Sequence, residues 1–210
     1  MVVSENRRPL KSRSKPWAQA LAKFLVSRKV KPNHISIAGV IFSVTGGGFL
    51  LLHAWGNAFL YLAVAACIQA RLLCNLMDGL VAVEGGLKSN YGDLYNEIPD
   101  RIADAVLFIC AGYAAGSATS GWICAVLAVF TAYLRVFGGS LGQKQDFCGP
   151  MAKQQRMFVL TLGCLFASVN FLIGGADHAL LVMLWIIAAG SAATSVRRIL
   201  RIAKRSLPSP

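Results

Sequence analysis

Six long apolar stretches dominate this sequence of 210 residues, and polar segments separate them. They cover approximately residues 35–55, 58–76, 102–116, 122–137, 157–173 and 179–196. A membrane-spanning helix needs about 20 predominantly apolar residues, so the chain has room for about six spans and little else. We therefore predict an all-α integral membrane protein with six transmembrane helices. The third and fourth stretches are short, and we expect their helices to extend into the polar sequence beside them.

The charged residues are few and mostly basic. The chain has 21 Lys and Arg against 9 Asp and Glu, and only 14% of its residues are charged, whereas soluble domains are typically about 25% charged. The three short connections predicted at 53–57, 116–121 and 174–178 contain no Lys or Arg. Because basic loops stay in the cytoplasm, we predict a protein of the inner (cytoplasmic) membrane with both termini in the cytoplasm. The cations form no single basic patch, which argues against nucleic-acid binding.

The chain divides into a basic N-terminal segment (1–34), a membrane domain (35–196) and a basic C-terminal tail (197–210). In the first segment Trp17, Leu21, Phe24 and Leu25 recur at helical spacing among lysines and arginines. This pattern is typical of an amphipathic helix that lies on an anionic membrane surface. The alternative is an ordinary solvated helix.

The acidic residues are concentrated at one end of the second and third predicted spans. Six of the nine lie between residues 78 and 104: Asp78, Glu84, Asp93, Glu97, Asp100 and Asp104. Ionisable groups at a membrane edge are energetically costly, so their clustering indicates a functional site. The spacing leaves a second explanation open, in which these acids only cap helices and form ion pairs. Their partners would then be Arg71, Lys88 and Arg101.

Helical spacing groups the polar side chains of this region into two faces. Asn75 and Asp78 share one face, and Asn96, Asp100 and Asp104 share another. Two adjacent helices would bring these faces together at the cytoplasmic edge of the membrane. Oxygen ligands without His or Cys select hard cations, so the pattern predicts a site for Mg²⁺ or Mn²⁺.

The stretch from residue 75 to residue 100 resembles the signature of the CDP-alcohol phosphatidyltransferases. That signature reads D-x-x-D-G-x-x-A-R, eight residues, then G-x-x-x-D-x-x-x-D. Its positions are occupied here, in order, by Asn75, Asp78, Gly79, Ala82, Val83, Gly92, Asn96 and Asp100, with no gap. The first and third aspartates are thus asparagines, and valine replaces the arginine. The six spans and the amphipathic entry helix are also similar to the family.

The resemblance implies a transferase of glycerophospholipid biosynthesis. Such an enzyme moves a phosphatidyl group from CDP-diacylglycerol to a small alcohol, releases CMP, requires Mg²⁺ or Mn²⁺ and forms a homodimer. The resemblance places metal ligands at Asn75, Asp78, Asn96 and Asp100, with Asp100 as the general base. It assigns nucleotide binding to Asp78, Gly79, Ala82 and Gly92. The acceptor stays open among glycerol 3-phosphate, an inositol phosphate, serine and others, and the donor could be another CDP-alcohol.

The two asparagines change the charge of the implied metal site. Four aspartates balance two divalent ions, whereas Asp78 and Asp100 alone balance one. Either a neighbouring acid, Glu97 above all but also Asp93 or Asp104, supplies a further ligand, or the site works with one metal. Oxygen-bearing residues remain at all four ligand positions, which favours an active enzyme. The alternative is a non-catalytic lipid- or nucleotide-binding membrane protein that retains the family fold.

A group of cations follows the fourth predicted span. Arg135, Lys153 and Arg156 are expected on the same aqueous side as the acidic cluster. In the family, cations in this region help to bind the phosphate of the acceptor or of the lipid, and we predict this role for all three. The alternative role is anchoring of the cytoplasmic loops at the membrane.

Overall fold

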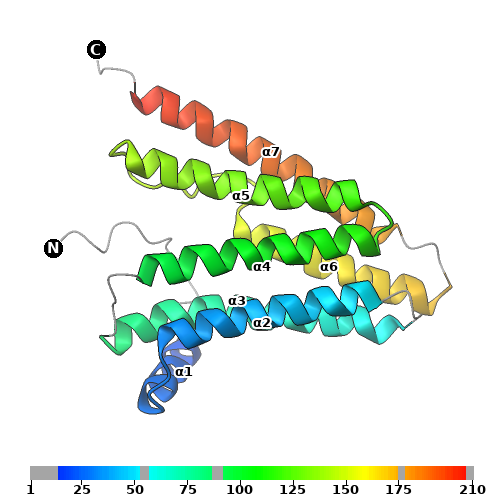
Figure 1. Cartoon of the computed structure of the whole chain (residues 1–210), viewed down its shortest axis with the longest axis horizontal. Helices are drawn as coiled ribbons and strands as arrows, with labels where there is room; N and C mark the ends of the chain where they lie inside the picture. Colours follow the sequence, from blue (N-terminus) through cyan, green and yellow to red (C-terminus); the bar gives the residue numbers. More distant parts are fainter. Residues whose placement is uncertain (1–13, 53–56, 87–91, 175–177, 207–210) are drawn as a thin grey trace.

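The computed structural model describes residues 14–52, 57–86, 92–174 and 178–206, and every regular element in these ranges is a helix (Figure 1). The helices are α1 (Pro16–Ser27), α2 (Pro32–Leu51), α3 (Ala58–Glu84), α4 (Gly92–Ala114), α5 (Ala118–Ser140), α6 (Lys153–Leu172) and α7 (Ala179–Ser206).

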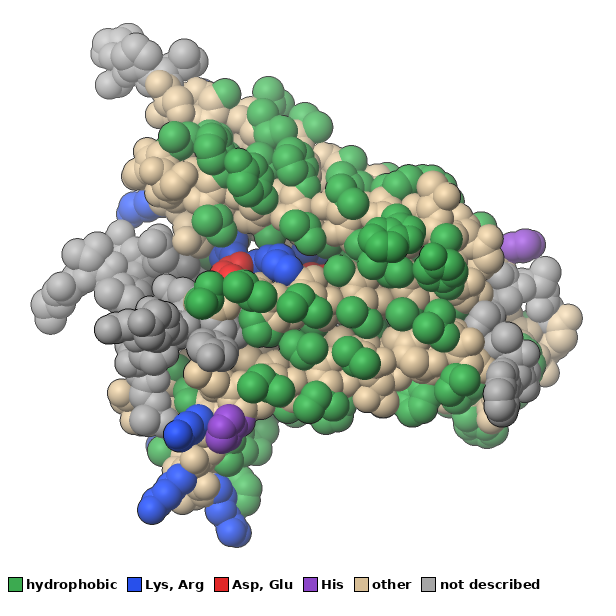
Figure 2. Space-filling model, viewed as in Figure 1, with side chains coloured by type: hydrophobic (Ala, Val, Ile, Leu, Met, Phe, Trp, Pro, Cys, Tyr) green, Lys and Arg blue, Asp and Glu red, His purple; other side chains and the backbone are tan. Residues whose placement is uncertain are grey.

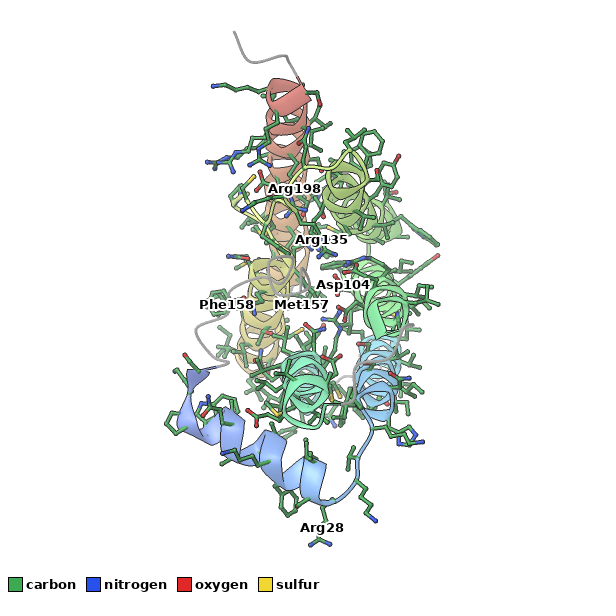
Figure 3. The ribbon with its side chains drawn as sticks, turned by 90° about the vertical axis from the view of Figure 1, so that its left-hand side faces the viewer. Arg28, Asp104, Arg135, Met157, Phe158 and Arg198 are labelled. Atoms are coloured by element: carbon green, nitrogen blue, oxygen red, sulfur yellow. The ribbon has the colours of Figure 1, made fainter. Side chains whose placement is uncertain are left out.

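The six long helices form a closed ring that runs up and down the molecule. Helix α2 packs against α3 and α4, α4 packs against α5, and α5 packs against α7; the ring closes through α6, which contacts both α7 and α3 (Figure 3). Helix α1 packs across α3 at one end of this bundle. The C-terminal ends of α3 and α5 and the start of α4 lie at the same end (Figure 1).

The surface of the bundle is apolar enough to face lipid. In the described part of the chain, α2, α3, α5, α6 and α7 are long and apolar enough to cross a membrane. Phe59 and Leu200 are more than half exposed and Phe166 is half exposed, and Figure 2 shows hydrophobic side chains spread along the length of the bundle. The chain is therefore a multi-pass membrane protein. Helix α4 packs between α2 and α5 but is polar in its first half, so the count of six spans stays a prediction.

Several helices are longer than the apolar stretches that predict them. Helix α4 begins at Gly92 rather than at residue 102, and α7 continues to Ser206 rather than ending at 196. The polar residues in these extensions find partners inside the bundle: Arg198 of α7, for example, donates to the carbonyl oxygens of Thr131 and Cys148. The domain limits predicted at residues 34 and 197 consequently fall inside α2 and α7.

Helix α1 buries two alanines against α3 and exposes two aromatic side chains. Ala18 and Ala22 are fully buried against α3, whereas Trp17 and Phe24 are about half exposed. A helix with exposed aromatic side chains among cations suits a membrane surface. The structure confirms the helix, and its position at the membrane surface stays a prediction.

A pair of glycines brings α4 and α5 into close contact. A Cβ atom added to Gly112 would lie 2.6 Å from the Cα atom of Gly121, too close for any larger residue. Small residues allow helix backbones to approach one another in membranes. This contact fixes the position of α4, the helix that carries most of the acidic cluster.

Candidate functional site

The two predicted polar faces meet where α3 and α4 pack side by side. The side-chain amide of Asn75 donates hydrogen bonds to both carboxylate oxygens of Asp100, at 3.1 and 2.9 Å. Asp78, buried on α3, accepts a hydrogen bond of 2.9 Å from the hydroxyl of Ser36 on α2. The side chain of Asn96 lies outside the described residues, and for Gly92 only its place at the start of α4 is described.

Asp104 is the centre of a buried ion-pair cluster in the middle of the bundle. It pairs with Arg71 of α3 and, at 3.5 Å, with Arg156 of α6, and all three side chains are at most 2% exposed. Arg156 also donates to the hydroxyl of Thr131, at 2.8 Å. Buried charges are tolerated only when they are paired and hydrogen-bonded. The cluster therefore joins α3, α4, α5 and α6 at one point.

Asp100 lies one helical turn closer to the start of α4 than Asp104, and it has a different set of partners. The ammonium group of Lys153 pairs with its Oδ2 atom, and a nitrogen of Arg71 lies 3.6 Å from its Oδ1 atom. Its side chain is 19% exposed, compared with 1% for Asp104. Asp100 is thus held firmly but remains accessible.

Glu97 is the outermost acid of this row whose side chain the structure describes. Its two carboxylate oxygens pair with Arg101 on the same helix and with Arg135 on α5. In Figure 2 acidic and basic side chains are visible in a recess between α4 and α5, and Figure 3 shows Arg135 directed toward this region. Both arginines would compete with a metal ion for this carboxylate, and the metal-ligand role of Glu97 stays a prediction.

All three cations predicted from the sequence therefore lie in the site, each opposite one acid of α4. Arg135 pairs with Glu97, Lys153 with Asp100, and Arg156 with Asp104. Their predicted role in phosphate binding is a separate question, which these ion pairs do not decide.

A sharp turn before α6 places two of these cations. Gly149 has a φ of 125°, and a Cβ atom there would lie 2.3 Å from the Cγ2 atom of Thr194 on α7. Two residues later, the backbone N–H of Met151 donates to the hydroxyl of Thr194, at 3.0 Å. Lys153 then begins α6, and Arg156 follows one turn later. The turn therefore sets the positions of both cations relative to α7.

Outside the helices, one carboxylate of the loop between α5 and α6 is also paired. Partial burial favours the protonated form of Asp146, but hydrogen bonds from the Cys148 backbone and from Arg201 hold its pKa below the usual value. Arg201 and Arg205 of α7 lie 3.1 and 3.3 Å from this carboxylate. Asp146 therefore ties the loop to the end of α7.

A small polar cavity lies between α2, α3 and α4. Its polar lining comes from Ser36, Arg71, Asn75, Asp78 and Asp100, and its volume of about 10 Å³ has room for one particle of the size of a water molecule. Of its two carboxylates, Asp100 has cationic partners, whereas Asp78 forms no ion pair with the described residues. Asp78, Asp100 and the amide oxygen of Asn75 form a donor set that suits a hard divalent cation.

The predicted nucleotide-binding positions continue from this cavity toward the end of α3. Gly79 and Ala82 lie on the last turns of the helix, and both are partly exposed. Val83, at the position of the signature arginine, is 54% exposed. Nucleotide binding by these residues stays a prediction.

A larger cavity of about 320 Å³ lies on the other side of Asn75. It is bounded by Trp17 of α1, by Gln69, Leu72, Leu73, Asn75 and Leu76 of α3, and by Gln154 of α6. Its lining is partly apolar and partly amide. Asn75 borders both cavities, and the other α3 residues that line them lie on different faces of the helix.

One site residue lies outside the sequence predictions, and a second was predicted only under the alternative explanation of the acidic cluster. Ser36 contacts Asp78 from a position 42 residues earlier, and no local pattern marks it. Arg71 lies one helical turn before Asn75 on the same face of α3, so helical spacing could have identified it. The ion pairs expected for Arg71 and Arg101 under that alternative are present: Arg71 pairs with Asp104 and Asp100, and Arg101 pairs with Glu97.

Comparisons with known proteins find phosphatidylinositol phosphate synthases among both the related sequences and the similar structures. No family model matches the sequence. The chain is 27% identical over 196 residues to a phosphatidylinositol phosphate synthase of Streptomyces avermitilis, which covers 88% of this chain and 77% of that protein. It is also 27% identical over 197 residues to a phosphatidylinositol phosphate synthase of Corynebacterium glutamicum, which covers 90% and 85%.

Solved structures share the fold. The phosphatidylinositol phosphate synthase of Mycobacterium tuberculosis with CDP-DAG bound superposes with a TM-score of 0.72 at 24% identity, over 88% of this chain and 92% of that one. The same protein in complex with manganese and citrate gives a TM-score of 0.73 at 23% identity, over 89% and 88%.

Proposed function

Because the chain belongs to the CDP-alcohol phosphatidyltransferase family, we propose that it transfers the phosphatidyl group of CDP-diacylglycerol to a phosphorylated small alcohol and releases CMP. The observation that carries this proposal is the pocket where Asn75, Asp78 and Asp100 meet at the signature spacing. The fold, shared with a protein that binds CDP-DAG, supports the same donor. The reaction would serve phospholipid biosynthesis.

Asp100 is the proposed catalytic base. The acceptor hydroxyl gives its proton to this carboxylate as its oxygen bonds to the lipid-bearing phosphorus, and the bond from that phosphorus to the CMP oxygen breaks. The hydrogen bonds from Asn75 orient the carboxylate for this transfer. Accurate placement of reacting groups is a large part of such catalysis.

A divalent cation fits the donor set of the pocket. Asp78, Asp100 and the amide oxygen of Asn75 would hold Mg²⁺ or Mn²⁺, and a relative's structure that contains manganese supports this choice. Such an ion neutralises charge on the donor's diphosphate. Gly79, Ala82 and Gly92 would leave room for the cytidine along α3 and at the start of α4.

The acceptor is proposed to carry a phosphate. Arg101 and Arg135 share the single carboxylate of Glu97, so the recess between α4 and α5 has one positive charge in excess. An anionic group is the natural complement of such a site. Because the relatives are named phosphatidylinositol phosphate synthases, an inositol phosphate is the first acceptor to test.

We also propose where the lipid lies and where the protein acts. The cavity between α1, α3 and α6 would receive part of the diacylglycerol, because it is partly apolar and adjoins Asn75. The charge asymmetry of the loops supports a cytoplasmic-membrane protein with both termini in the cytoplasm. Homodimer formation, implied by the family resemblance, belongs to the same proposal.

CMP release tests this function directly. Purified protein in detergent would be incubated with CDP-diacylglycerol, Mn²⁺ or Mg²⁺, and inositol phosphate, unphosphorylated inositol or glycerol 3-phosphate. We expect metal-dependent CMP release with a phosphorylated acceptor, and loss of release in Asp100→Ala. A folded protein that binds CDP-diacylglycerol but releases no CMP with any acceptor would instead support the non-catalytic binding protein.

A further inference from the structure

We propose that the ammonium group of Lys153 takes the place of a second divalent cation, so that this site works with one bound metal ion and one built-in cation. The inference deepens the proposed function and rests on it. It also assigns Lys153 a role other than the phosphate binding predicted from the sequence.

The contacts of Asp100 are the first reason. Its Oδ2 atom pairs with Lys153, and both of its oxygens accept hydrogen bonds from Asn75. In a site with two metal ions, a carboxylate at position 75 and Asp100 would be shared between the ions. Here the amide of Asn75 stands at that position, and the ammonium group of Lys153 lies beside Asp100, where the second ion would lie. Asn75 thus donates hydrogen bonds to Asp100, and Lys153 neutralises the charge of the same carboxylate.

The charge of the surroundings is the second reason. Four carboxylates of the described site, on Asp78, Glu97, Asp100 and Asp104, face five cations, on Arg71, Arg101, Arg135, Lys153 and Arg156. The cluster is already positive before any ion binds. One divalent ion can be accommodated at Asp78, the carboxylate without an ion-pair partner among the described residues. A second would add two charges to a site with no carboxylate left to balance them.

The third reason is the small volume of the cavity beside Asp78 and Asp100. Paired metal ions in phosphoryl-transfer sites lie about 3.5–4 Å apart. The cavity that adjoins Asp78 and Asp100 has a volume of about 10 Å³, enough for one particle of the size of a water molecule. The ammonium group of Lys153 occupies the adjoining position beside Asp100 and is buried there.

Lys153 can hold this position because the chain delivers it rigidly. It is the first residue of α6 and follows a turn that Gly149 and Thr194 fix against α7. A covalently attached cation cannot dissociate, so the single positive charge of Lys153 stays beside Asp100 at any metal concentration. The rate of CMP release should therefore rise with the first power of the Mn²⁺ concentration.

Counting bound Mn²⁺ tests the inference without relying on turnover. Free Mn²⁺ would be followed by electron paramagnetic resonance during titration of the purified full-length protein. We expect one ion per chain in the unaltered protein and in Asn75→Asp, and two in the double variant Asn75→Asp/Lys153→Met. The double variant should also show the spin-coupled spectrum of two neighbouring ions. Lys23→Met, which removes an exposed lysine of α1, should bind one ion and serves as the matched control.

A single variant covers the case in which the double variant does not fold. Lys153→Met alone should bind its Mn²⁺ about tenfold more tightly, because a like charge beside the ion is removed. Lys153→Arg, which keeps the charge, should restore the original affinity. Unchanged or weaker Mn²⁺ binding in Lys153→Met would overturn the inference.

The outcomes separate the inference from the proposed function. Two ions bound to the unaltered protein would overturn the inference, and CMP release would still establish the reaction. One bound ion without CMP release would support the one-ion site and count against the enzyme. No bound ion at all would overturn both.

Discussion

Two buried carboxylates in neighbouring regions of the bundle have opposite surroundings. Asp104, in the centre, is 1% exposed and lies between two arginines. Asp78, at the wall of the small cavity, is 6% exposed, and a single hydroxyl group donates to it. Two arginines pair with the single negative charge of Asp104, whereas no cation among the described residues lies within ion-pair distance of Asp78. Burial alone therefore does not distinguish the two carboxylates, and the absence of a neighbouring cation is what favours Asp78 as the proposed metal ligand.

The largest effect is expected from Asp104→Ala. Removal of this carboxylate leaves Arg71 and Arg156 buried with uncompensated charge, which costs about 3–5 kcal/mol in the free energy of unfolding. Denaturant unfolding in detergent, followed by circular dichroism, would measure the loss. A stability close to that of the unaltered protein would remove the distinction between the two carboxylates.

Asp78→Asn is expected to leave stability almost unchanged and to impair function strongly. It keeps the hydrogen bond from Ser36 within reach and strands no arginine, so unfolding should change by less than about 1 kcal/mol. Mn²⁺ binding should be lost, and CMP release should fall by about 10²–10³, the usual effect of removing one electrostatic contributor to a transition state. Titration with Mn²⁺ and the CMP assay would measure the two losses of function. A large loss of stability in denaturant unfolding would contradict the prediction.

Arg135→Met should have an intermediate effect, confined to the acceptor. The recess would lose its excess positive charge, because Arg101 and Glu97 then balance each other. We expect KM for a phosphorylated acceptor to rise about tenfold, equivalent to about 1.4 kcal/mol of binding, with kcat nearly unchanged. Steady-state kinetics with phosphorylated and unphosphorylated acceptors would check this, and equal effects on both would exclude phosphate recognition.

The smallest effect is expected at Asp146, whose partners are about two-fifths exposed. Because its pKa is lowered in the folded protein, its contribution is present at neutral pH and is lost as the pH falls below the usual Asp value of about 3.9. Asp146→Asn should cost at most about 1 kcal/mol at pH 7. The difference from the unaltered protein should vanish at low pH, as unfolding at several pH values would show.

The sequence predicted which segments form helices better than it predicted which helices pack against one another. Hydropathy and the resemblance indicated six helices, and the structure has a helix at each place, but the order around the ring could not be read. Spans that are apolar on most sides carry little periodic signal, so no face is marked for a particular partner. The polar faces were an exception: the meeting of Asn75 with Asp100 follows from helical spacing in two adjacent helices.

The partners of the acids were harder to predict. Glu97 was expected as a spare ligand because it follows Asn96, yet Arg135, 38 residues later, pairs with it. Ser36 and Arg156 likewise reach their carboxylates from distant helices. Such pairs depend on the ring order, which the sequence did not reveal. The acidic residues could be identified from the sequence, but most of their partners could be identified only from the fold.

The turn at Gly149 has a consequence for how this chain can tolerate insertions. Residues added before the turn would lengthen only the loop after α5, and α6 would still begin at the same point. One residue added between Gly149 and Lys153 would rotate the start of α6 by about 100°, because an α-helix has 3.6 residues per turn. Both Lys153 and Arg156 would then leave their carboxylates together. Length variation in this loop should thus be tolerated on one side of Gly149 only.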